Sequence, residues 1–568
     1  MHFEARGVQY VALGATPFKP SIQTPDEPSL VTLVAAENGV ELSKAWLETY
    51  LDKLDEGDVY QKRPFLAGLI LTNFKTGQIP SDFREYLDSL GNRWLDFQFD
   101  DGPVQALDPG PYVFQNNALK SVCRLYDDEQ RAFLTALKPK LGPSEPTGFL
   151  QPKVAGASYD CLSITVPPRT PASITHPEPA PFTANIVQSL VASGAHILGL
   201  TKLSSMIARE EPMDAVDYLT AFNPRADGYQ SPAGSSSGSA AAVAAYDWVD
   251  CGVSTDTSGS GRRPTMVNGV WEFRLSHDST SLSGMITTYP LFDTPCVFTR
   301  SLSTLRRVVE TWIPSPTRDP PPPAYKLVYP VDYLPVKNGD QMKLIESFID
   351  DMKTLLPATV LQFSIRDSWK QSHPPGTPDD VDKYLDDVVT RTFYDQFYHS
   401  LNAFCKKYSE THNGQTPYVI PFVQRRWAKG AAVSTAEHQD ATQRMLVYKQ
   451  WLLDTLFSDP NTETLIVVPV ANAAPNYRDE ISPSPEKQSA LDELFLQPIL
   501  GAPDVVIPIG DVPCESRISG KTEFLPVAAN VVAAPKRDFQ LLQAIEKVMA
   551  RSGRPTIVST GPRMFPGN

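Results

Sequence analysis

The sequence predicts an α/β fold in which a mixed, largely parallel central sheet is covered by helices, with a small α+β domain at the N-terminal end. Three observations lead to this prediction. A helical pattern at 183–193 is followed closely by a short apolar run at 196–200. The continuous apolar runs Thr464–Val470 and Val505–Ile509 are typical of strands buried on both faces. An amphipathic helix at Leu541–Ala550 then closes the domain.

The composition indicates a globular protein and excludes several functions. The chain has 568 residues, enough for one large domain with additions, and 41% of them are hydrophobic, which argues against wholesale disorder. The net charge of −14 argues against a nucleic-acid partner. The first ten residues lack the features of a signal peptide, and no apolar run approaches the roughly 20 residues of a membrane span. We therefore expect no membrane span and a cytoplasmic location.

The cysteines and histidines give no sign of a metal site. The six cysteines are scattered without a CxxC pair, and the eight histidines show no HExxH spacing. We therefore expect neither a disulfide framework nor a bound metal, and nothing in the sequence indicates a cofactor.

Residues 1–140 are predicted to form the N-terminal α+β domain, and residues 145–568 the main domain. Period-two and period-3.6 hydrophobic patterns alternate in the first part without any recognisable chemistry. The patterns predict strands at Val8–Leu13 and Leu30–Ala35, a further apolar run at Phe65–Leu71, and helices at Leu42–Leu54 and Phe83–Leu90.

The main domain begins with a predicted helix, turn and strand. Thr183 is a candidate N-cap, and Gly194 is suited to end the helix in a left-handed conformation. His196 would then lie in a short buried strand, where a hydrogen-bonded core histidine is the more common outcome than a catalytic one.

A mainly helical insertion is predicted at about 314–460. It opens with the proline-rich segment 314–323, which can form neither a regular helix nor a central strand. Amphipathic spacing predicts helices at Gln341–Leu356, Val381–Tyr408 and Ala436–Phe457. Their aromatic residues are expected to pack the helices together, with the lining of a substrate pocket as the alternative.

Two serine- and glycine-rich clusters organise the main domain. The first, Gly234–Ser239, runs directly into the good helix former Ala240–Ala245, and the second, Thr255–Ser260, follows a short apolar run. Tight loops of small residues let backbone N–H groups converge on an oxyanion, and their serines can supply a nucleophile. The alternative is a flexible linker, but a linker would not pass unbroken into a helix or be followed by a second such loop.

The stretch 231–264 resembles the hallmark of the amidase signature family, a GGSSGGS loop followed by GTDTGGSIRxP. Here the two loops are AGSSSGS and STDTSGSGRRP. The likeness extends over roughly residues 145–310 and 420–550. Further matching segments are Gly194–Lys202, Asn223-Pro224, Val267–Val270, Phe292–Pro295, Ala502–Gly510 and Leu525–Val527. Gly110–Tyr112 and Arg124–Tyr126 resemble a lead-in of fungal amidase-like proteins.

The resemblance implies a Ser–Ser–Lys triad in which a neutral lysine acts through a bridging serine that follows a cis peptide. Carried over by position, Ser260 is the nucleophile and Ser235 the bridging serine. The oxyanion hole would be formed by the backbone N–H groups of Thr257, Ser258, Gly259 and Ser260, with Asp256, Arg262 and Ser236 as supporting residues.

The lysine of this triad is missing from its expected place. The family carries it in a VAVKDxxD-like segment, and the equivalent segment here is 153–160, where Ala157 occupies the lysine position. Lys153 lies four residues earlier, about 13 Å away along an extended strand. Lys202 is the other lysine that could reach inward. Loss of a general base typically costs about 10²–10⁴-fold in rate.

The signature loop also differs at two positions around the nucleophile. Ser258 replaces a glycine, and a serine would be strained there if the position required a positive φ. Gly261 replaces the usual apolar residue after the nucleophile, which is expected to loosen that side.

Three functions remain open. The first is an amidase-like enzyme that acts on a small-molecule amide or ester through Ser260. The second is a pseudo-amidase that cyclises, eliminates or isomerises a small metabolite, with Ser235 and Ser260 polarising a carbonyl. The third is a non-catalytic binding protein. The partner expected in each case is a small molecule, and a homodimer is one option for the oligomeric state.

Overall fold

The computed structural model describes most of the chain, in two compact units, Met1–Asp127 and Asp128–Asn568. The boundary lies before the predicted position at 140, because strand β8 (Phe133–Ala136) pairs with β11 (Gly199–Thr201) of the second unit. The description covers residues 1–568 except 37–41, 57–58, 73–78, 99–106, 108, 137, 140–148, 151–182, 205, 207, 210, 216–218, 314–323, 482–486 and 567–568.

The first unit is built on a seven-stranded mixed sheet with parallel ladders between β3, β4 and β5. The predicted strands and helices are all found, except that the strand in the run from Phe65 begins only at Gly68. In spatial order the strands are β1 (His2–Ala5), β2 (Val8–Pro17), β7 (Ala118–Arg124), β6 (Gly110–Gln115), β3 (Ser29–Ala35), β4 (Gly68–Thr72) and β5 (Trp94–Gln98). The helices are α1 (Lys44–Asp55), α2 (Lys62–Phe65) and α3 (Ser81–Ser89).

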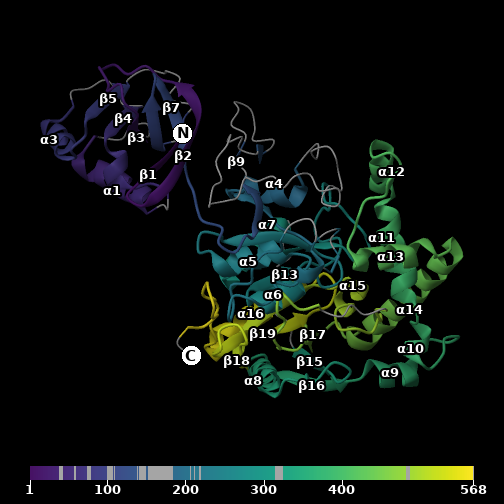
Figure 1. Ribbon diagram of the computed structural model, residues 1–568. Helices are drawn as coiled ribbons and strands as arrows, with labels where there is room; N and C mark the ends of the chain where they lie inside the picture. The colour runs from purple at the N-terminus through teal and green to yellow at the C-terminus, as the bar shows by residue number, and fades with distance from the viewer. Residues whose placement is uncertain are drawn as a thin grey trace. The chain divides into compact units, whose positions relative to one another are not determined.

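The second unit is built on an eight-stranded mixed sheet, which confirms the predicted α/β fold (Figure 1). Its ladders are parallel only between β17, β15 and β16 and antiparallel elsewhere. Apolar runs report burial on both faces but not strand direction, so they did not reveal the antiparallel part. In spatial order the strands are β12 (Cys251–Asp256), β14 (Thr294–Thr299), β13 (Trp271–Arg274), β18 (Asp504–Glu515), β19 (Thr522–Val532), β17 (Thr462–Val468), β15 (Ala324–Pro330) and β16 (Ala358–Phe363).

The two faces of this sheet differ in chemistry. One face carries Val253, Val297, Phe273, Val505 and Val531 into the largest apolar core. Helices α7 (Leu302–Trp312), α8 (Gly339–Leu355) and α16 (Asp538–Ser552) pack on that side. Helices α5 (Ser237–Ala245) and α6 (Arg262–Asn268) contact the opposite side, which carries the polar residues of the site.

The segment around His196 differs from the prediction. Helix α4 (Asn185–Ala192) is preceded by Ala184 as its N-cap residue, with no side-chain cap, so Thr183 does not cap it. Gly194 has a φ of +90°, as a helix-ending glycine should. His196 is exposed and precedes β11, which belongs to a two-stranded sheet with β8 and is only half-buried. The prediction of a buried core histidine is therefore wrong.

The predicted insertion is more than a helical addition. It supplies strands β15 and β16, which form one edge of the central sheet. The predicted helices at 341–356 and 436–457 are found, but the one at 381–408 is broken into several pieces. The opening segment 314–323 lies outside the described residues.

The remaining elements complete the second unit, and Figure 1 shows α10–α14 gathered in one green group. In the described part of the chain, none of the helices has both the length and the apolar character needed to cross a bilayer. These elements are α9 (Ile365–Ser372), α10 (Val381–Tyr384), a π-helical turn (Thr390–Tyr394), α11 (Asp395–Ser400), α12 (Asn402–Thr411), α13 (Pro421–Ala431), α14 (Thr435–Leu456), α15 (Leu496–Leu500), a 3-10 turn (Pro212–Asp214), β9 (Lys138–Pro139) and β10 (Phe149–Leu150).

Candidate functional site

The two serine loops meet at the start of α5 and α6. The backbone N–H of Ser236 donates to the carbonyl oxygen of Ser260 at 3.3 Å. The Ser254 hydroxyl, on β12, donates to the Ser236 hydroxyl. The peptide between Gly234 and Ser235 is cis. Ser235 and Ser236 are buried and Ser260 is half-buried, so the predicted nucleophile and bridging serine belong to one site.

Close backbone approach fixes the first loop. The N–H of Gly238 donates to the carbonyl of Lys202 at 3.0 Å, and the N–H of Ser204 donates to the carbonyl of Ser235 at 2.9 Å. A Cβ at Gly238 would lie 2.3 Å from the carbonyl oxygen of Ala132. Only glycine fits this position, and the small alanines that follow let α5 bury itself against the sheet.

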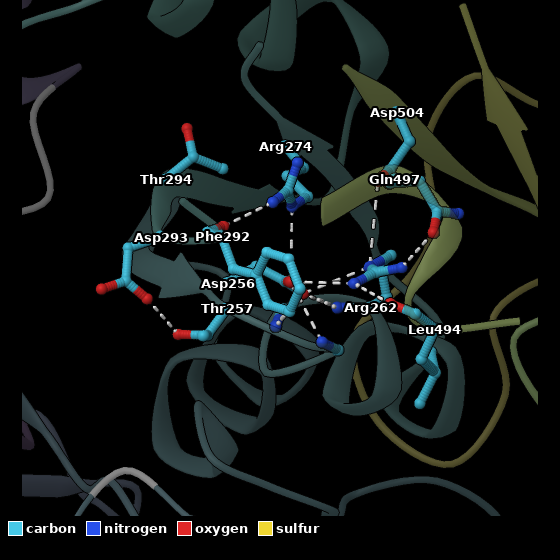
Figure 2. Close-up of polar contacts among 12 residues, drawn as sticks. Asp256, Thr257, Arg262, Arg274, Phe292, Asp293, Thr294, Leu494, Gln497 and Asp504 are labelled. Atoms are coloured by element: carbon cyan, nitrogen blue, oxygen red, sulfur yellow. Dashed lines mark hydrogen bonds and ion pairs between the residues drawn. The ribbon is translucent and has the colours of Figure 1, made fainter. Parts of the chain in front are cut away.

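Asp256 holds the second loop in place (Figure 2). Its carboxylate accepts the N–H of Gly259 at 3.0 Å and that of Gly261 at 2.8 Å. The guanidinium groups of Arg262 and Arg274 contact the same carboxylate at 2.9 and 3.4 Å. Burial alone would raise the pKa of Asp256, but Arg262 and Arg274 hold that pKa well below its usual range. The carboxylate therefore stays ionised and fixes the loop at neutral pH.

The expected oxyanion hole is partly changed by this arrangement. Gly259 is one of its predicted donors, but its N–H is directed at Asp256. The N–H groups of Ser258 and Ser260 have no hydrogen-bond partner among the described residues. Gly259 has a φ of +112°, whereas Ser258 has no positive φ, so the strain expected at Ser258 is absent. A Cβ at Gly259 would also lie 3.0 Å from the side chain of Leu494.

Thr257 ties the loop to a second buried carboxylate. Its hydroxyl donates to Asp293 at 2.6 Å, and the N–H groups of Thr288 and Tyr289 donate to the same carboxylate at 2.7 and 2.9 Å. Burial raises the pKa of Asp293. The Thr257 side chain thus supports the loop by its bond to Asp293.

The outlying matching segments converge on the same loops. The Asn223 amide donates to the carbonyls of Ser231 and Val267 at 3.3 and 2.9 Å. The Asn268 amide, on α6, donates to the carbonyl of Pro232 at 3.1 Å. The two asparagines therefore connect the segment before the first loop, Ser231 and Pro232, with helix α6, which follows the second loop.

Of the two lysines that could take the place of the missing one, the structure describes Lys202. Ala157 and Lys153 lie outside the described residues. The Lys202 ammonium donates to the carbonyl of Leu219 at 3.0 Å, and burial lowers the pKa of Lys202 to about 8. The amine is thus directed at a backbone carbonyl.

Sequence reasoning missed a set of ionisable residues beneath the second loop. Glu272 and Asp504 are completely buried on neighbouring strands, β13 and β18, and Cys296 is buried on β14. A signal was present, because the segment Val270–Leu275 places a glutamate and an arginine at alternate positions of an otherwise apolar run. Among the described residues, no group of histidine, cysteine or carboxylate side chains could hold a metal ion.

The fold is of the α/β class, and comparisons with known proteins relate part of the chain to amidases. Residues 160–344 match the family model described as Amidase. Over these residues the chain is similar to the amidase signature family. It is 42% identical over 138 residues to Amidase 1 of Oryza sativa subsp. japonica, which is 24% of this chain and 31% of the relative. It is 43% identical over 129 residues to Amidase 1 of Arabidopsis thaliana, covering 23% and 30%. The match thus spans less than a third of these relatives.

Solved structures share the fold at low sequence identity. The 6-aminohexanoate cyclic dimer hydrolase complexed with substrate aligns with a TM-score of 0.50 and 16% identity, over 65% of this chain and 77% of that chain. The allophanate hydrolase of Kluyveromyces lactis aligns with a TM-score of 0.51 and 16% identity, over 70% and 60%. These likenesses concern the fold alone.

Proposed function

We propose that the protein hydrolyses an amide or ester bond of a small molecule, with Ser260 as the nucleophile. The observation that carries the proposal is the joining of the two serine loops by the bond from Ser236 to Ser260. It brings a half-buried serine together with a second serine, Ser235, in the order that the family uses. The match of residues 160–344 to the Amidase family model and the likeness of part of the chain to two plant enzymes named Amidase 1 support amide hydrolysis.

The proposed reaction follows from the groups present. The Ser260 Oγ attacks the substrate carbonyl carbon and gives its proton to the Ser235 Oγ, which passes its own proton on to the nitrogen or oxygen atom of the leaving group. The carbonyl oxygen becomes an oxyanion, which the N–H groups of Ser258 and Ser260 stabilise. The amine or alcohol then leaves with a proton, and water hydrolyses the acyl-enzyme. Asp256 acts only on the loop, because both of its oxygens are bonded to loop N–H groups and guanidinium groups.

A pseudo-amidase is the second candidate, favoured by one observation. The Lys202 ammonium is directed at a carbonyl of the chain, and the family's lysine position is Ala157. In that case the serine hydroxyls polarise a carbonyl of a small metabolite that is cyclised, eliminated or isomerised. A cytoplasmic location and a homodimer stay predictions.

A fluorophosphonate probe tests the proposal, because it reacts only with an activated serine. We expect the wild-type protein to be labelled, Ser260→Ala to lose the label, and Ser239→Ala to keep it. Ser239 is a suitable control because it lies in the same loop region and bonds to Thr201. Absence of labelling, together with thermal stabilisation by small amides, would instead support the pseudo-amidase or a binding protein.

A further inference from the structure

A buried ionisable cluster lies on the sheet face beneath the Ser260 loop. Glu272 and Arg274 are alternate residues of β13 and therefore share a face. Arg274 stands opposite Asp504 on β18 and opposite Cys296 on β14. All four side chains are completely buried. The cluster thus belongs to the platform on which the nucleophile loop rests.

Glu272 contacts the residue that follows the nucleophile. A Cβ at Gly261 would lie 2.5 Å from the Glu272 Oε1 and 2.7 Å from the Cys296 Sγ. The room that an apolar side chain after Ser260 would use is therefore filled by the Glu272 carboxyl group. The expectation that Gly261 loosens the loop is therefore wrong, because the Glu272 carboxyl group occupies the space that a side chain at position 261 would fill.

The carboxyl oxygens of this cluster are poorly compensated. All four oxygens of Glu272 and Asp504 are buried, and none has a hydrogen-bond partner of good geometry in the described part of the chain, although the Asn530 side chain lies near enough to Asp504 to lower the pKa of that acid. The nearest cation contact is 3.8 Å, from the Arg262 Nε to Asp504. An ionised carboxylate without hydrogen bonds is strongly disfavoured in such surroundings, so a neutral acid is favoured.

The number of protons on the carboxyl groups of this cluster follows from the balance of its positive and negative charges. Two guanidinium groups, of Arg262 and Arg274, face three carboxyl groups, of Asp256, Glu272 and Asp504. Asp256 is ionised, so one further negative charge makes the cluster neutral. The remaining carboxyl group then keeps its proton.

The other groups that face this cluster do not change the count. Burial raises the pKa of the Cys296 thiol, which stays neutral, and Asn530 and Gln497 carry no charge. Glu493 lies near Arg262 and Arg263, and burial raises the pKa of Glu493. Burial, and then the neighbouring Asp504, raise the pKa of Glu272 well above its usual range, and burial raises the pKa of Asp504 to about 7.

We propose that Glu272 and Asp504 together hold one proton, so that one of the two carboxyl groups is neutral while the other is ionised, and that this proton makes Glu272 a positioning residue for the Ser260 loop. With the proton present, a neutral carboxyl group packs against Gly261. Once it is lost, an uncompensated negative charge lies beside the loop. The role in catalysis rests on the proposed function, whereas the shared proton does not.

The direction of the pH effect follows from linkage. Both acids have pKa values above those of the unfolded chain, so above about pH 4 the folded state still holds a proton that the unfolded chain has lost; this proton is released as the pH rises through the folded pKa values, of which that of Asp504 is about 7. The stability from this proton is complete below the unfolded pKa values and is lost as the pH rises through the folded ones. The folding constant falls by up to about tenfold per pH unit for one proton.

Denaturant unfolding of the full chain between pH 5 and 8 tests the shared proton. We expect Glu272→Gln and Asp504→Asn each to flatten the pH dependence by up to one proton, because the remaining carboxylate then balances the charges alone. Glu463→Gln is the matched control, a buried glutamate of the same sheet that pairs with Arg537 at 2.6 Å. It should keep the wild-type pH dependence. A wild-type pH dependence in both cluster variants would overturn the proposal.

Fluorophosphonate labelling tests the positioning role. The labelling rate of the wild type, relative to Glu272→Gln, should fall as the pH rises from 6 to 8. Equal pH profiles would leave Glu272 a purely structural residue and refute the positioning role. A protein that does not label at all would contradict the proposed function, while the unfolding comparison would still decide the shared proton.

Discussion

The backbone N–H of Ser236 and the carbonyl of Ser260 are joined by a hydrogen bond of 3.3 Å. It links the residue after the candidate bridging serine to the candidate nucleophile itself. The relative position of the two hydroxyl-bearing residues is therefore set by the main chain. Side-chain changes beneath the loops should act on the site by moving this backbone.

Removing the buried cation of the loop should be costly. Arg262→Met leaves the Asp256 carboxylate with a weaker counter-charge in a fully buried place, and breaking a buried pair costs about 3–5 kcal/mol. Denaturant unfolding measures the loss. Arg366→Met is the control, because the half-exposed Arg366 makes a similar two-bond contact with Asp382, besides one bond to Asp332, and an exposed pair is worth about 1 kcal/mol or less. Equal losses in the two variants would contradict the role given to Arg262.

Gly261 and Glu272 should behave as a matched pair. Gly261→Ala places a methyl group against the Glu272 carboxyl group, and such overpacking typically costs about 1–3 kcal/mol. In the background of Glu272→Ala the same change should cost less, since one of the two obstructing groups is gone and the Cys296 Sγ remains. A double-mutant cycle of unfolding free energies measures the coupling. Strict additivity would mean that the two residues do not compete for the same space.

Lys202 should make stability rise at alkaline pH. Its folded pKa of about 8 lies below the ordinary lysine value of 10.5, so the unfolded chain holds more protons between these values. The stability gain is therefore absent below about pH 8 and develops as the pH rises towards 10.5, by at most about tenfold per pH unit. Lys202→Met should remove this rise.

The control for Lys202 is another lysine with the same kind of contact. The Lys326 ammonium donates to the carbonyl of Leu456 at 2.9 Å. Lys326→Met should leave the alkaline pH dependence of unfolding as it is in the wild type. If Lys202→Met also leaves it unchanged, the Lys202 amine is not titrating in a buried environment.

The local features of the site could be predicted from the sequence, because short-range patterns determine them. The helix of small residues at the first loop follows from residue type and spacing, whereas the sequence left open which residue of the second loop has a positive φ, which is Gly259 and not Ser258. The partner of Gly261 could not be predicted, since Glu272 reaches it only through sheet register and helix packing. The exposed His196 shows the same limit, because an apolar run does not reveal which sheet its strand will join.

The alternation along β13 has a consequence for how the chain finds its register. Trp271 and Phe273 enter the apolar core, while Glu272 and Arg274 face the nucleophile loop. A slip of one residue would place both charged side chains among the aliphatic residues of the opposite face. The buried charges of Glu272 and Arg274 therefore disfavour misaligned pairings of this four-residue strand. Residues that are costly to bury thus help to select the correct strand register during folding.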